Sequence, residues 1–310
     1  GDALFTGDPR RALAKAIDEA ETVAARGRLT LMLKSNRKVV LTLRVLGSYS
    51  ATAPYNCSKT DKIITQIAES LLKSGRAGSG STRAGLLGLM ATGEKKYLDA
   101  VGRIINAEKG DFAWLKKSDG KPMKGAIYSI WYWSYSEIAL SEYYLLTKDE
   151  SLLPGIRSLA LTLALSQDAG GLWGHTPVNS STGRLHGYAQ MNQPSLAAFM
   201  GMLLAHECGV RDPVLDKAIA RSYAYFKNYI GKGTFGYGVG SGSTRGFNNN
   251  GMSGSAAICM ALKGNSAGAR FFSQMAATSY DDLEGGHASY VFNPLWTGLG
   301  AHISGPEVTR

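Results

Sequence analysis

Apolar residues recur at helical spacing along most of the chain, and short polar turns interrupt them at nearly constant intervals. The turns at Gly93, Lys148, Gly209 and Gly264 are 55, 61 and 55 residues apart. Each turn joins an apolar segment to an amphipathic one, as in the stretch LLGLMATGEKKYL that starts at Leu86. A near-constant period of this length predicts that one helical hairpin is used repeatedly.

The two helices of each hairpin differ in their pattern. Segments such as Ser195–Ala205 are apolar nearly all round, which is typical of helices buried on all sides. Their partners, such as Pro213–Tyr229, keep a polar face and belong outside. The sequence therefore predicts a mainly α fold, an α/α toroid with about five inner and about five outer helices. The inner helices are expected near 83–91, 128–146, 191–207, 252–262 and 291–302. The outer helices are expected near 59–74, 94–107, 150–167, 212–230 and 266–280.

The first 47 residues follow a different pattern. Asp8 can cap a helix that has Pro9 at its first position, and we expect Gly27 to end that helix. Residues 28–34 and 39–45 then alternate apolar and polar positions around a turn, which predicts a β-hairpin. The predicted parts are a small α+β helix-plus-hairpin segment (1–47), a linker rich in turn formers (48–58) and the helical array (59–310).

Several segments resemble known families. The stretch QDAGGLW at Gln167–Trp173 matches the Q-x-x-x-G-x-W repeat motif of the squalene-cyclase and prenyltransferase toroids. The helix-plus-hairpin front is similar to the C-terminal part of a bacterial PDZ-like domain, truncated at its start. Together with three longer stretches, it resembles an uncharacterised bacterial family in which a PDZ-like segment precedes an α/α toroid. The stretches are GYAQMNQPSLAAF (187–199), NNNGMSGSAA (248–257) and SYDDLEGGHASYVFNPLWTGLG (279–300). The resemblance implies the toroid fold and an exported, periplasmic or extracellular, location, and it implies no established activity.

Composition narrows the classes of function. The chain has 34 Lys and Arg against 24 Asp and Glu, a net charge of +10 that favours polyanionic partners. Nucleic acid is a poor fit because no basic, aromatic-interleaved helix or known binding module is recognisable. No apolar run is long enough to predict a membrane span. The three cysteines lack the spacing of metal ligands, so we expect neither a metal site nor a cofactor.

Candidate functional residues gather where the predicted inner helices begin. In an α/α toroid the loops that enter the inner helices lie on one rim, so the repeat would bring distant segments together. Here these loops are rich in Asn, Gln, Tyr, Trp, His and Gly, whereas the turns at the opposite rim are plain Lys/Glu/Asp turns. We therefore expect a pocket at the entry rim, with positive helix ends directed at it. The five segments are STRAG (81–85), GAIYSIWYWSYSE (125–137), HGYAQMNQ (186–193), RGFNNNGMSGS (245–255) and GGHASYVFNPLW (285–296).

Roles follow from side-chain chemistry. His287 could act as a general base near neutral pH and Tyr290 as a proton donor, with Tyr188 and Asn192 as further catalytic candidates. Two arginines could clamp a carboxylate, and amide and aromatic side chains could bind a polysaccharide or another small-molecule or polymeric ligand. The substrate-binding candidates are Gln193, Asn249, Asn250, Asn293, Arg83, Arg245, Trp131, Trp133, Trp296, Glu137 and His186. Each also has an ordinary structural interpretation as a helix cap, a packed core residue or a solvated surface group.

The leading hypothesis is a lyase that cleaves an acidic polysaccharide by β-elimination. That reaction needs a neutral Asn, Gln or His to damp the uronate carboxylate, and a Tyr or His as base and acid. A glycoside hydrolase, which needs two carboxylates across a cleft, is the second choice, with Glu137 available. Two alternatives stay open: a non-catalytic toroid that binds glycan or protein, and a terpenoid-cyclase-like enzyme or hydrophobic-ligand binder. Whether the central cavity is polar or apolar would separate them. The pattern leaves the substrate and the oligomeric state undetermined.

Overall fold

The computed structural model describes residues 8–78, 83–123, 129–185, 190–236, 238, 251–278 and 289–309, with the side chains of 289–291 and 309 outside this description. Within these residues the chain is mainly helical and contains one two-stranded sheet. The chain separates into two compact units, Gly1–Lys73 and Ser74–Thr309. The predicted helical class is therefore confirmed.

Helix α1 (Pro9–Ala20) opens the first unit and begins as predicted. The Asp8 side chain accepts a hydrogen bond from the Arg10 N–H at 2.9 Å, the geometry of an N-cap. The predicted end at Gly27 is wrong, because the helix stops at its C-cap directly after Ala20. The Thr22 hydroxyl donates to a carbonyl of the last helical turn at 2.8 Å and accepts a backbone N–H at 3.2 Å. This local turn competes with further helical hydrogen bonds.

The predicted hairpin is present in the first unit. Strands β1 (Arg28–Met32) and β2 (Lys38–Thr42) pair antiparallel, with Leu29 opposite Leu41. Leu29 is buried and Leu41 is exposed, so the small sheet covers little core of its own. Such a hairpin needs support from a packed helix, and α1 lies against β1.

A buried lysine fixes the start of α2 (Ser58–Ser74) in the first unit. The Lys59 ammonium is 1% exposed and lies 2.5 Å from the Asp18 carboxylate and 2.7 Å from that of Glu21. Two carboxylates near one buried cation satisfy the charge that burial would otherwise penalise. The predicted bounds of this helix, 59–74, match the structure. Helix α2 belongs to the N-terminal compact unit, whereas the sequence pattern assigned it to the helical array.

The second unit holds the helical hairpins, with bounds within a few residues of those predicted. The apolar helices are α3 (Ala84–Ala91), α5 (Ser129–Thr147), α7 (Asn192–Glu207), α9 (Met252–Leu262) and α11 (Ser289–His302). The amphipathic ones are α4 (Lys95–Ile105), α6 (Leu153–Leu165), α8 (Pro213–Lys227) and α10 (Ser266–Thr278). Short elements complete the described part: the 3-10 helices Ala113–Lys117 and Glu150–Leu152, and α12 (Pro306–Thr309).

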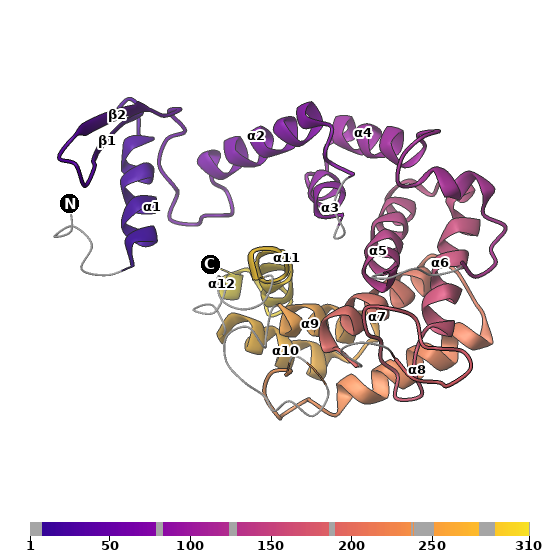
Figure 1. Cartoon of the computed structure of the whole chain (residues 1–310). Helices are drawn as coiled ribbons and strands as arrows, with labels where there is room; N and C mark the ends of the chain where they lie inside the picture. The colour runs from indigo at the N-terminus through magenta and orange to yellow at the C-terminus, as the bar shows by residue number, and fades with distance from the viewer. Residues whose placement is uncertain are drawn as a thin grey trace. The chain divides into compact units, whose positions relative to one another are not determined.

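The helices of the second unit form two rows (Figure 1). In the inner row α3 packs on α5, α5 on α7, α7 on α9 and α9 on α11. In the outer row α4 packs on α3, α6 packs on α5 and α7, and α10 packs on α9 and α11. Helix α8 packs on α7 of the inner row and on its outer neighbour α6. Helix α7 is buried from Asn192 to Ala205 without a polar face. The pattern therefore predicted correctly that α7 and α9 are buried and that α4, α8 and α10 keep an exposed face. Helix α6 differs from the prediction, because it is buried over most of its length.

The segment Gln167–Trp173 ties the end of α6 to α8. The Gln167 amide donates to the Ala218 carbonyl at 3.0 Å and to the Ser222 hydroxyl at 2.8 Å. The Trp173 indole N–H donates to the Leu163 carbonyl at 2.9 Å. Each side chain of this motif thus satisfies buried polar groups within the protein, which makes the motif a packing device here.

Candidate functional site

Part of the predicted entry rim lies outside the described residues. This holds for the catalytic candidates His287 and Tyr188, and for the side chain of Tyr290, whose backbone lies in α11. It also holds for four substrate-binding candidates: His186, Arg245, Asn249 and Asn250. The pocket expected at the entry rim therefore stays a prediction.

The described amide candidates are buried at the starts of inner helices. Asn192 is 0% exposed; its amide donates to the Gly236 carbonyl at 2.8 Å, and its carbonyl accepts from the Tyr225 hydroxyl at 2.9 Å. Gln193 in α7 and Asn293 in α11 are also buried. Asn192 thus holds the first turn of α7 to α8 and to the segment after it, and its hydrogen-bonding groups are already used.

Arg83, a predicted carboxylate clamp, is buried within the protein. The side chain is 1% exposed, and its Nη1 donates to the Asp111 carboxylate at 2.6 Å and to the Gly78 carbonyl at 2.5 Å. Its guanidinium carbon lies 4.9 Å from the centroid of the Phe112 ring and 4.6 Å from that of Tyr132. Arg83 therefore joins the start of α3 to the loop before the first 3-10 helix and to α5.

The three candidate tryptophans belong to the inner row. Trp133 is buried in α5. Trp131 is half-buried, donates its indole N–H to His175 Nδ1 at 2.7 Å and stacks on Phe292 of α11 with ring centroids 5.1 Å apart. Trp296 stacks on Tyr135 and donates to its hydroxyl at 3.0 Å. These rings form an aromatic layer between α5 and α11, in which Trp131 and Phe292 are partly open to solvent.

Glu137 is fully buried between α5 and α7. Its Oε1 accepts a hydrogen bond from the Ser141 hydroxyl at 3.3 Å, while Oε2 has no partner among the described residues. A Cβ on Gly201 of α7 would lie 3.1 Å from the Glu137 side chain, which shows how closely the two helices pack. Burial raises the pKa of Glu137 well above its usual range, and the Ser141 hydrogen bond lowers it only in part. Burial therefore favours the protonated form of the Glu137 carboxyl group.

We expect Glu137→Gln to raise the free energy of unfolding by about 2 kcal/mol at pH 8 and to change it little at pH 4. Because the folded-state pKa of Glu137 is raised, its native carboxyl keeps a proton that the unfolded chain releases above about pH 4.3. Stability is therefore full below that pH and falls as the pH rises toward the folded pKa. Urea unfolding at both pH values measures the difference. Parallel pH dependence in both proteins would contradict a neutral Glu137.

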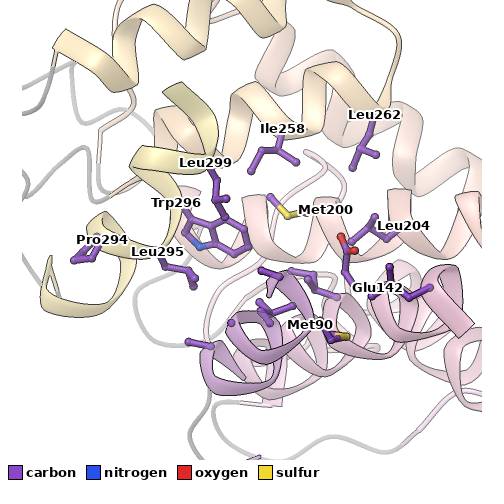
Figure 2. Close-up of a pocket in the computed structure, with 16 residues that line it drawn as sticks. Met90, Glu142, Met200, Leu204, Ile258, Leu262, Pro294, Leu295, Trp296 and Leu299 are labelled. Carbon is purple, nitrogen blue, oxygen red and sulfur yellow. The ribbon is translucent and has the colours of Figure 1, made fainter. Parts of the chain in front are cut away.

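A cavity of about 640 Å³ lies between the inner helices of the second unit (Figure 2). All five inner helices contribute to its walls. Examples are Leu87 from α3, Ile138 from α5, Met200 from α7, Ile258 from α9 and Leu299 from α11. The walls are leucine, isoleucine, methionine, alanine, glycine, proline and tryptophan, apart from one acidic residue. The described cavity is therefore apolar.

The cavity lies toward the C-terminal ends of α5, α7 and α9, and it is lined by α3 along its whole length and by the middle of α11. On α5 the residues that line it start at Ile138 and end at Leu146, one residue before the helix ends. On α7 they are Met200 and Leu204, and on α9 the last is Leu262, its terminal residue. The sequence pattern placed the expected site at the opposite, N-terminal ends. An apolar side chain directed at a cavity has the same spacing as one directed at a packed neighbour, so the pattern does not reveal the space.

Glu142 is the single charged residue among the described residues that line the cavity. It belongs to the face of α5 that also carries Ile138 and Leu146, each four residues away. Its carboxyl group points from α5 into the space between the apolar side chains (Figure 2). Burial raises the pKa of Glu142, and no hydrogen bond or ion pair to it occurs within the described part of the chain.

Sequence reasoning selected Glu137 and passed over Glu142, although a signal for both was present. They are the two charged residues in the apolar stretch that became α5. A charged side chain within a buried helix is rarely without a role, so each of them merited attention. Only the helix packing distinguishes them: Glu137 faces α7 across a closed interface, and Glu142 faces open space.

Neither a metal cluster nor a membrane-spanning helix occurs within the described residues. No group of three or more His, Cys, Asp or Glu side chains there is placed to hold a metal ion. None of the described helices combines the length and the apolar character needed to cross a membrane.

Comparison with known proteins identifies the family. Searches of curated proteins and of solved structures gave no match. A domain of unknown function (DUF6288) matches residues 60–310, from α2 to the end of the chain, and so includes every helix that lines the cavity. Because the match covers most of the chain, the protein belongs to the DUF6288 family.

Proposed function

We propose that the helical unit binds an apolar small molecule in the cavity between its inner helices. Its volume of about 640 Å³ falls within the range of roughly 300–1,000 Å³ that small-molecule sites occupy. Leu146 and Leu299 line it and are each 54% exposed, so apolar surface is left for a ligand to cover. Covering such surface yields about 25 cal/mol per Å². The apolar cavity is the observation that carries the proposal.

This cavity supports an apolar ligand better than the acidic polysaccharide expected from the sequence. Asn192 and Arg83, the residues expected from the sequence to contact a uronate, are buried and form hydrogen bonds within the protein, although Nη2 of Arg83 has no partner among the described residues. A polyanion would also meet no described cationic side chain in the cavity walls. The lyase hypothesis stays a prediction about the entry rim. Release of an unsaturated, ultraviolet-absorbing product from uronate polymers would support it.

The fold around the cavity is part of the proposal. We propose that the inner row closes on itself as an α/α toroid, since α3 and α11, its first and last helices, line the same cavity. For the first unit we propose a PDZ-like segment, because α1 and the antiparallel pair follow in the expected order. The export proposal rests on the family resemblance alone.

Gly88→Phe is expected to abolish binding of the apolar dye Nile red, which we use as the probe. Gly88 lines the cavity, and a Cβ built on it meets no atom within 4 Å, so a phenyl group can enter the space without a clash. The variant is expected to fold at least as stably, because glycine inside a helix costs about 0.5–1 kcal/mol. Fluorescence titration measures the loss of affinity, at least tenfold.

Gly298→Phe is the matched control. Gly298 lies in α11, does not line the cavity and likewise has open space around its Cβ. It adds the same apolar ring to the protein, so dye that binds anywhere on the surface would respond to it. Equal losses in Gly88→Phe and Gly298→Phe, or no loss in either, would contradict binding in the cavity.

A further inference from the structure

We propose that the ligand of this cavity is an amphiphile whose polar end is a single cationic group, an ammonium, paired with Glu142. This inference rests on the proposed function and adds the chemical class of the ligand. A molecule that is apolar throughout would contact the apolar walls and leave the carboxyl group of Glu142 without a partner.

The first argument is the isolation of this carboxyl group. Glu142 is partly buried and has no hydrogen bond or ion pair within the described residues, and every other described residue of the cavity wall is uncharged. A carboxylate transferred from water into apolar surroundings loses favourable hydration unless a partner replaces it. A ligand cation would supply that partner, and the apolar walls would strengthen the attraction by excluding water.

The second argument is the direction of the surrounding helices. The cavity is lined by the last residue of α3 (Ala91), by Leu146 and Leu204 near the ends of α5 and α7, and by Leu262 at the end of α9. The C-terminal end of a helix carries a partial negative charge from its unpaired carbonyl groups. Helix α3 lines the cavity from its first residue, Ala84, to its last, so its two ends oppose each other there. The ends of α5, α7 and α9 favour a cation over an anion, in the same sense as Glu142.

The lysines at these helix ends do not cancel this field within the cavity. Lys148 follows α5 and lies 5.5 Å from the centroid of the Tyr144 ring. Lys263 follows α9 and lies 5.6 Å from that of Tyr223. Neither the lysines nor these tyrosines line the cavity. The raised pKa of Glu142 adds support, since it reflects burial without a compensating cation.

Three probes that share a twelve-carbon alkyl chain and differ in their polar group separate the ligand classes: dodecylamine, 1-dodecanol and dodecanoate. Each is titrated calorimetrically into the full-length protein at pH 7.5. We expect dodecylamine to bind about tenfold more tightly than 1-dodecanol, and dodecanoate to bind most weakly. Glu142→Gln is expected to lower the affinity for dodecylamine about tenfold and to change the affinity for 1-dodecanol less than about threefold. Glu150→Gln, an exposed substitution near the same helix end, removes the same charge and is expected to leave all three unchanged.

The outcomes distinguish the proposal of a cationic ligand from the proposal that the cavity binds an apolar molecule. If 1-dodecanol binds as tightly as dodecylamine, or dodecanoate binds best, the cationic ligand is excluded while binding in the cavity stands. An equal loss of dodecylamine affinity in Glu150→Gln would also overturn it, because the preference would then reflect overall charge. If none of the three probes binds, the proposed function itself fails.

Discussion

Arg83→Ala is expected to lower the free energy of unfolding by about 3 kcal/mol. The substitution removes the hydrogen bonds from Nη1 to the Asp111 carboxylate and the Gly78 carbonyl, and the weaker one from Nε to Ser136 at 3.4 Å. It also removes the guanidinium from its place beside two aromatic rings. Asp111 is 54% exposed and can regain water, so the loss comes mainly from packing and from buried acceptors left without a donor. Urea unfolding followed by circular dichroism measures it.

Two further variants show whether geometry or charge matters at this site. Arg83→Lys keeps the charge, but an ammonium cannot reproduce the planar contacts with several partners, so we expect most of the loss to persist. Arg103→Ala removes an exposed arginine in the last turn of α4 and should change stability by less than about 0.5 kcal/mol. If Arg83→Ala left stability unchanged and instead abolished binding of a uronate polymer, the carboxylate clamp predicted from the sequence would be the correct role.

Gly254→Val is expected to destabilise the protein by about 3 kcal/mol and to disturb the cavity. A Cβ at Gly254 of α9 would lie 2.1 Å from the Trp296 carbonyl oxygen, far inside contact distance. A Cβ at Gly300 of α11 would likewise lie 2.2 Å from the Gly254 Cα. Backbone atoms cannot turn aside as a side chain can, so α9 and α11 would have to separate. Trp296 lines the cavity, so affinity for Nile red should fall along with the melting temperature.

Gly298→Ala is the control for this second prediction. It lies in α11 between Trp296 and Gly300, and its added Cβ meets nothing within 4 Å. We expect it to be neutral or to stabilise by about 0.5–1 kcal/mol, because alanine restricts the unfolded chain more than glycine does. Comparable destabilisation by both substitutions would mean that helix propensity, and not the contact between α9 and α11, determines the effect.

Burial gives the polar groups of α5 and α7 different roles from those their residue types suggested. Asn192, a catalytic candidate by its residue type, is buried and holds the first turn of α7 to neighbouring segments. Glu137 looked like one of a catalytic pair and instead lies within a helix interface. Residue type restricts which chemistry is available, and the direction of the side chain determines whether a ligand can reach it.

Apolar periodicity along the chain established the helices, their approximate ends and the division into buried and covering rows. Those features depend on residues within a few turns of one another, where a repeat of 3.6 residues is directly readable. Local turn chemistry was harder to read, as the end of α1 shows, since the Thr22 turn and a helical continuation use the same backbone groups.

Packing between distant segments determined the rest. Trp296 reaches the Tyr135 hydroxyl across 161 residues of sequence, and Arg83 finds Asp111 across 28. Whether five apolar helices fill the space between them or leave a cavity depends on how their side chains meet, and no local pattern records that. The cavity and the unpaired Glu142 within it therefore emerge only when the inner helices are brought together.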